Sequence, residues 1–410
     1  MTQSVREPQT GRDWLLQFPV ALREVAAVRL IAAFGAGGVL YLTPLVFHQE
    51  LFSASQVTLG VALAALVGTA SRFAAGLMLD RGMNSGTPVL LAVLASVLGD
   101  VRLFSAEGFA AYLAGQVLLG IAMGLYWPAI ELAVALACAT GPAPLPSARG
   151  YALVRSADAL GIAGGALLGA TLSVAGLLRG IYLVDILCVL TLAGLLLRRR
   201  LPDAPGRTRQ RAPGPGTWLP PLLPLLLITL VATSLPALMQ SALPLDLVRG
   251  GLGRPAMAQS LGALLIGVQL GLLVLIQWPV GQALARRPVR RGIGLSLLSF
   301  AGGTALLAAS SLSGLGVGLV LVAQLPLALG QAAFLPIATE AVIELTPPQH
   351  QGLAMALFSQ CFAISGFIAP LLAGRALDAQ GHGAALWLVV AAACLAAVPL
   401  AARLRPTSSA

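Results

Sequence analysis

The sequence predicts an all-α integral membrane protein with twelve transmembrane helices, arranged as two pseudo-symmetric six-helix bundles. Three observations lead to this fold class. The 410 residues are 58% hydrophobic and 10% charged, whereas about a quarter of the residues in a soluble domain are charged. Twelve stretches approach the ~20 apolar residues that a helix needs to cross a bilayer. Polar signatures in the first half of the chain recur in the second half, which indicates duplication.

The twelve spans follow one another with short loops between them. We place them at residues 25–46, 55–78, 88–104, 109–138, 150–172, 180–197, 219–243, 256–279, 292–312, 314–343, 352–373 and 384–402. They form an N-terminal bundle (25–197) and a C-terminal bundle (221–402). A segment at 1–24, a proline- and arginine-rich linker at 198–220 and a tail at 403–410 complete the chain. We expect all three in the cytoplasm.

Two repeated signatures support the duplication. A glutamine and a proline twelve residues apart occur in the fourth span, beginning at Gln116, and again in the tenth, beginning at Gln324. The hexapeptide Gly-Leu-Met-Leu-Asp-Arg beginning at Gly76 has a degraded copy beginning at Gly281. The two offsets, 208 and 205 residues, are nearly equal. Each half is therefore expected to repeat the same six-helix unit.

The distribution of arginine orients the spans. All 25 basic residues are arginines. With the N-terminus in the cytoplasm, seventeen lie on the cytoplasmic side, five lie outside, and Arg29, Arg72 and Arg155 lie within predicted spans. This bias follows the positive-inside rule and predicts an inner (plasma) membrane protein with both termini in the cytoplasm. The net charge of +10 is then a signal of topology, and we expect no nucleic-acid partner.

Missing residue types exclude several kinds of chemistry. Without lysine, the chain cannot form a phosphate-binding loop of the G-x-x-x-x-G-K-[ST] type or a Schiff base. The four cysteines are isolated and the three histidines lie in different loops, so no metal site is indicated. We expect no cofactor, no metal and no enzymatic activity. Uphill work would have to use an ion or solute gradient.

The loop between the second and third spans indicates a family. Gly76, Asp80 and Arg81, together with the twelve spans, the parallel halves and the basic linker, resemble the major facilitator superfamily, closest to its drug-exporter-like members. The resemblance covers nearly the whole chain and implies a secondary transporter that works by alternating access. The family pattern, approximately G-x-L-A-D-R-x-G-R-R, is only partly met, because no basic pair follows Gly82. The second copy keeps Arg286 but has lost the aspartate.

The resemblance implies a gating role for this loop. Asp80 and Arg81 would brace the two halves at the cytoplasmic surface in the outward-facing state, and Gly281 and Arg286 would form the weaker second copy. Arg72 lies four residues before Gly76, on the same helix face, and is included in the predicted latch. The alternative is that these residues only cap helices and fix topology.

Charged residues within the spans form a second predicted group. Glu131, Arg155 and Asp158 are expected at similar depth, where they would neutralise one another, and Glu340 is expected at the cytoplasmic mouth. Because a neighbouring arginine stabilises an ionised carboxylate, we expect a structural or gating role for them. Intramembrane charges are also candidates for direct function. Proton-linked exporters of this superfamily commonly have an arginine at the position of Gln116, and its absence here disfavours proton antiport.

The resemblance also implies a substrate site near the midplane, between the halves. Polar and aromatic residues there are Tyr41, Gln116, Tyr126, Gln240, Gln324, Gln331 and Phe334. Ordinary packing is the alternative for each. Amides and aromatic rings, without an acid at mid-membrane depth, suggest a neutral or amphipathic organic solute.

The favoured function is secondary active transport of a small organic solute. Export coupled to an ion gradient, with the proton as the candidate ion, is placed slightly ahead of uptake of a sugar-like or other metabolite. A transport-inactive membrane scaffold or assembly factor of the same fold is the alternative, motivated by the degraded second hexapeptide. We expect the substrate and the lipid bilayer as partners, and a monomeric protein.

Overall fold

The computed structural model describes residues 15, 17–139, 147–198, 201, 219–284, 287–347 and 351–404. Arg286 lies outside these ranges, and for Asp80 only the backbone is described. Every element in the described ranges is a helix. Twelve of these helices are long and apolar enough to cross a membrane, so the predicted all-α membrane fold is confirmed. The chain is a multi-pass membrane protein.

The helices follow the predicted order. The first half contains α2 (Val20–Gln49), α3 (Ala54–Asp80), α4 (Gly86–Phe104), α5 (Phe109–Ala139), α6 (Ser147–Val174) and α7 (Gly180–Arg198). The second half contains α8 (Leu219–Arg249), α9 (Gln259–Leu284), α10 (Val289–Leu312), α11 (Gly316–Leu345), α12 (Gln351–Gln380) and α13 (Ala384–Ala402). Several helices run past the predicted spans, because a helix continues into the headgroup region, where polar residues are solvated.

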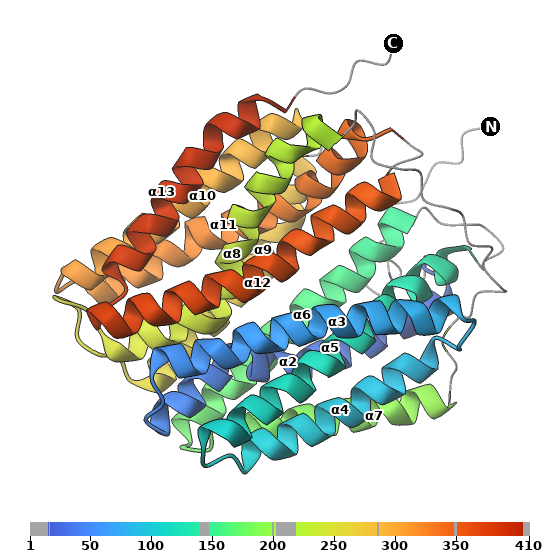
Figure 1. Cartoon of the computed structure of the whole chain (residues 1–410), viewed down its shortest axis with the longest axis horizontal. Coiled ribbons are helices and arrows are strands. Elements are labelled where there is room, and N and C mark those ends of the chain that lie inside the picture. The colour runs from blue at the N-terminus through green and yellow to red at the C-terminus, as the bar shows by residue number, and fades with distance from the viewer. Residues whose placement is uncertain are drawn as a thin grey trace.

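Helix packing repeats between the halves. In the first half α2 packs on α6, α5 lies between α3 and α4, and α4 packs on α7. The equivalent helices of the second half, six elements later, make the same pairs: α8 on α12, α11 between α9 and α10, and α10 on α13. Figure 1 shows the two groups as separate bundles. The pseudo-symmetry predicted from the repeated signatures is thus present in the packing.

Glycines allow α2 and α6 to approach closely. A Cβ atom at Gly165 would overlap the carbonyl oxygen of Phe34, and one at Gly161 would overlap the carbonyl oxygen of Leu30. Small residues of this kind bring membrane helix backbones together. The same contact places the charged residues of α2 and α6 side by side.

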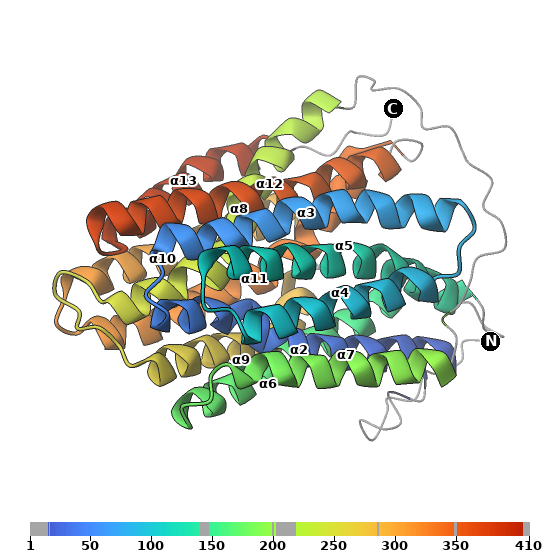
Figure 2. The ribbon, with the colours of Figure 1, turned by 60° about the horizontal axis from the view of Figure 1, so that its bottom comes forward.

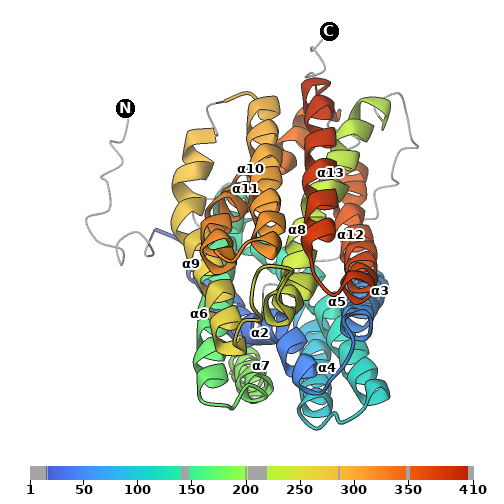
Figure 3. The ribbon, with the colours of Figure 1, turned by 90° about the vertical axis from the view of Figure 1, so that its left-hand side faces the viewer.

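Two seams join the halves. One is formed by α3 and α12 and the other by α6 and α9, and both are visible in the end-on view of Figure 3. Figure 2 shows α12 running alongside α3. We call the end where α2 begins and α13 ends the terminal end, because the first and the last membrane-spanning helix meet it (Figure 1). The opposite end, where α2 ends and α3 begins, is called the far end.

Candidate functional site

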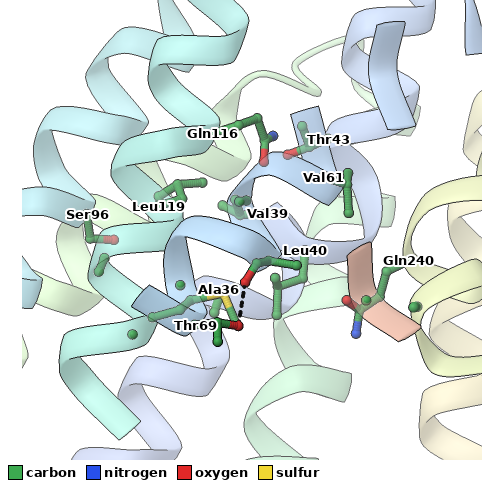
Figure 4. Close-up of a pocket in the computed structure, with 18 of the residues that line it drawn as sticks. Ala36, Val39, Leu40, Thr43, Val61, Thr69, Ser96, Gln116, Leu119 and Gln240 are labelled. Carbon is green, nitrogen blue, oxygen red and sulfur yellow. Dashed lines mark hydrogen bonds between the residues drawn. The ribbon is translucent and has the colours of Figure 1, made fainter. Parts of the chain in front are cut away.

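A cavity of about 240 Å³ lies between the halves, near the middle of the helices that surround it. Its wall comes from α2, α3, α4, α5 and α7 of the first half and from α8 and α12 of the second. Most of the lining residues are apolar, alanine above all, and seven have polar side chains. Figure 4 shows Thr43 and Gln116 around the cavity, with Gln240 of the second half facing them. A mainly apolar wall with a few convergent polar groups is typical of small-molecule sites.

A second cavity of about 240 Å³ adjoins the first and carries a buried ion pair. Arg29 of α2 pairs with Asp158 of α6, and both line this cavity. The guanidinium group of Arg29 lies 4.0 Å from the ring centroid of Trp127 and 5.4 Å from that of Tyr126. Arg29 is only 8% exposed. Ring stacking and the carboxylate together hold this charge in the cavity wall.

Hydrogen bonds between the halves close the far end. Asp378 of α12 accepts hydrogen bonds from the backbone N–H groups of Ala54, at 2.9 Å, and Ser55, at 2.8 Å, at the start of α3. Arg249 of α8 donates to the same carboxylate at 2.8 Å. Gln49 of α2 donates to Gln259 of α9. We call this set of contacts the far-end clasp.

The predicted latch residues lie at the terminal end. Arg81 follows the last residue of α3 and is exposed. A Cβ atom at Gly76 or at Gly281 would meet nothing within 4 Å. Arg72 differs from the other predicted latch residues. It lines the first cavity, and it is close enough to Glu131 for the two charges to interact. The roles assigned to Asp80 and Arg286 fall outside the described side chains and stay predictions.

The predicted charge group is arranged differently from expectation. The ion-pair partner of Asp158 is Arg29, whereas Arg155 and Glu131 are exposed and do not form an ion pair with it among the described contacts. The reason is the close approach of α6 to α2. Glu340, also exposed, feels the charge of Glu344 on the same helix.

The substrate-site candidates divide between the halves. Gln116, Tyr126 and Gln240 line the two cavities, whereas Tyr41 is buried in the core beside them. The candidates on α11 lie elsewhere in the second half, and none of them is among the residues that line these cavities. Gln324 is 2% exposed, Gln331 lies against Met239 and Phe334 is packed in the core.

Two buried carboxyl groups change the expected chemistry of the cavity. Asp185 of α7 lines both cavities, as Asp158 lines the second, so the expectation of a wall without an acid is wrong. Asp185 also contacts Asp100 of α4, a residue that the sequence analysis missed. Its signal was available: a single carboxylate within an apolar span is costly, and therefore a candidate for function.

The chain is similar to known proteins in the sequence of its second half and in its fold. Residues 241–410 match the family model of the Major Facilitator Superfamily. A POT family transporter solved in complex with 5-aminolevulinic acid is similar over 94% of this chain and 97% of its own, with a TM-score of 0.78 at 12% identity. The nucleoside transporter NupG is similar over 94% of this chain and 99% of its own, with a TM-score of 0.73 at 11% identity. No curated protein matches the sequence.

These findings confirm the family resemblance stated from the sequence. The second half carries the sequence signature of the superfamily, and the fold is shared over nearly the whole chain.

Proposed function

We propose that the chain is a secondary active transporter that moves a small amphipathic organic solute by alternating access. The observation that carries this proposal is the cavity between the halves, with polar groups from both halves in its wall. A site at the interface of two bundles becomes accessible from either side when the bundles rock against each other. The far-end clasp ties the two halves together on one side of the cavity.

The distribution of arginine predicts which side of the membrane the far-end clasp faces. With the terminal end in the cytoplasm of an inner membrane, as the positive-inside rule predicts, the clasp closes the outer side of the cavity. The structure then corresponds to an inward-facing state. The predicted latch at Asp80 and Arg81 would form when the halves close on the cytoplasmic side.

The cavity wall supports an amphipathic substrate. Its apolar area suits a hydrocarbon or aromatic portion, and the amides of Gln116 and Gln240 offer hydrogen bonds to a polar portion. The Arg29–Asp158 pair and Asp185 provide charges of both signs in the adjoining space. The related POT structure was solved with 5-aminolevulinic acid, and compounds of this small polar kind belong in the screening panel beside larger amphipathic ones.

The test is solute flux in reconstituted vesicles, with a matched pair of variants. Gln240→Leu removes an amide from the cavity wall, and we expect transport of the solute found by the screen to fall about tenfold, the effect of losing one hydrogen bond of ~1.4 kcal/mol. Gln324→Leu removes the same group from a buried position outside the cavity wall, and transport should persist. Equal losses in both variants would count against a substrate site at Gln240.

The same vesicles separate the remaining alternatives. Export, the direction favoured from the sequence, predicts accumulation in inverted vesicles under an imposed gradient, whereas uptake predicts accumulation in right-side-out vesicles. A transport-inactive scaffold predicts no flux of any compound in either orientation.

A further inference from the structure

Two carboxyl groups lie close together inside the first half. Asp100 of α4 is fully buried and Asp185 of α7 is 4% exposed. Both approach the same hydroxyl group: Oγ of Ser96 lies 3.3 Å from Oδ2 of Asp185 and 3.5 Å from Oδ2 of Asp100. Two ionised carboxylates so near each other repel, which favours a proton on one of them.

No described arginine forms an ion pair with either residue. The groups that face the pair are Tyr182 and Cys188 of α7, of which Tyr182 is hydrogen-bonded to Thr43 of α2. Arg29 lines the adjoining cavity but is paired with Asp158. The charge of the carboxyl pair is therefore controlled by protons and not by a fixed cation.

The second observation concerns the oxygen atoms that remain. Oδ1 of Asp100 and Oδ1 of Asp185 are both buried and accept no hydrogen bond from the residues that the structure describes. Buried acceptors of this kind are uncommon and need an explanation. At the same time Asp185 and Ser96 form part of the wall of both cavities. A proton that enters the cavity can therefore reach Asp185 directly. The carboxyl group of Asp185 has an oxygen atom to which no described hydrogen-bond donor is bound.

The position of the pair links it to the interface between the halves. Oδ1 of Asp185 lies against Gly35 of α2, where any side chain would collide with it. Leu40, five residues further along α2, lines both cavities together with Gln240 of the second half. A change of charge at Asp185 therefore acts on the helix that forms the wall of both cavities and contacts the opposite bundle.

We propose that Asp185 and Asp100 form the proton-binding pair that couples solute transport to the proton gradient. The pair with one proton carries one negative charge. It accepts a second proton from a hydronium ion in the cavity, which leaves a water molecule, and it becomes neutral; the reverse step returns the proton to water. The coupling role rests on the proposed transport function, whereas proton binding by the pair does not.

Proton binding is tested directly on the purified full-length protein. Infrared difference spectra between acidic and neutral pH should contain the carbonyl band of a buried carboxylic acid. The band should be lost in Asp185→Asn, shifted but retained in Ser96→Ala, and unchanged in Glu107→Gln, which alters an exposed acid in the loop after α4. A band that survives in both Asp185→Asn and Asp100→Asn would overturn the assignment.

Coupling is tested in vesicles with the solute identified by the screen. For Asp185→Asn we expect loss of accumulation driven by a pH gradient, while exchange of labelled for unlabelled solute at equal pH is retained. Full gradient-driven accumulation in this variant would overturn the coupling role, as would accumulation driven by a sodium gradient at constant pH. Absence of any flux in the unaltered protein would instead contradict the proposed function, and the infrared result would stand independently.

Discussion

Arg29 shows how a single residue can be misread from its position in a span. It lies near the start of a predicted helix, where a long side chain could reach the headgroups. In the structure α2 begins at Val20, so Arg29 lies more than two turns inside the helix. There its charge is matched by Asp158 and covered by the ring of Trp127. These partners come from two other helices, α6 and α5.

The first prediction at this scale concerns the Arg29–Asp158 pair. Arg29→Leu leaves a buried carboxylate without its partner, and such a loss costs about 3 kcal/mol or more. We expect a clear drop in the thermal midpoint of the purified protein. Adding Asp158→Asn should recover much of that drop, because the uncompensated charge is removed. An unchanged midpoint in Arg29→Leu would show that the pair does not contribute to stability.

At the scale of elements, the start of α3 is held by two different caps. Within its own half, Ser53 and Gln56 form a reciprocal capping box, with Gln56 N–H donating to Ser53 Oγ at 3.2 Å and Ser53 N–H donating to Gln56 Oε1 at 2.9 Å. Across the seam, Asp378 accepts from the next two amides. The unpaired N–H groups of a helix start favour a carboxylate. The helix end is thus both a local structure and part of the far-end clasp.

The second prediction tests that contact. Asp378→Asn removes the negative charge that the two amides and Arg249 share, and hydrogen bonds to a charged group contribute about 1.5–3 kcal/mol each. We expect the far end to open more often. Labelling of a cysteine introduced at Ser55 with a membrane-impermeant maleimide should become faster in the variant.

Its control is Glu107→Gln, which changes an exposed acid outside the seam and should leave the labelling rate unaltered. Equal labelling rates in all three proteins would show that Asp378 does not hold the far end closed.

At the scale of the whole molecule, the sequence predicted the number and order of the helices and their division into two similar bundles. Hydropathy and the repeats at Gln116 and Gln324 contain that information, because span length and duplication are properties of the chain itself. The polar contacts were harder to predict. Asp158 forms its ion pair with Arg29 because glycines allow α6 to pack closely on α2. Asp100 lies near Asp185 because α4 packs on α7. Such partners depend on how each helix is rotated, which hydropathy does not fix.

The third prediction concerns motion of the two halves as bodies. The side chains of Gln49 and Gln259 touch across the far end, so cysteines in both positions should be joined by a short bifunctional thiol reagent. If transport requires the far end to open, the cross-linked protein should be inactive, and each single cysteine variant treated with the reagent should be active. Full transport by the cross-linked protein would contradict alternating access at this end.

The clasp at Asp378 has a consequence for the tolerance of the chain to mutation. The carboxylate binds two main-chain amides, which every residue except proline possesses. Most replacements at positions 54 and 55 therefore preserve those two bonds, although the hydroxyl of Ser55 adds a third. The other side of the contact has no such freedom, because only an acidic side chain at 378 supplies the charge. At this contact between the two halves, the identity of one residue, Asp378 of the second half, matters most.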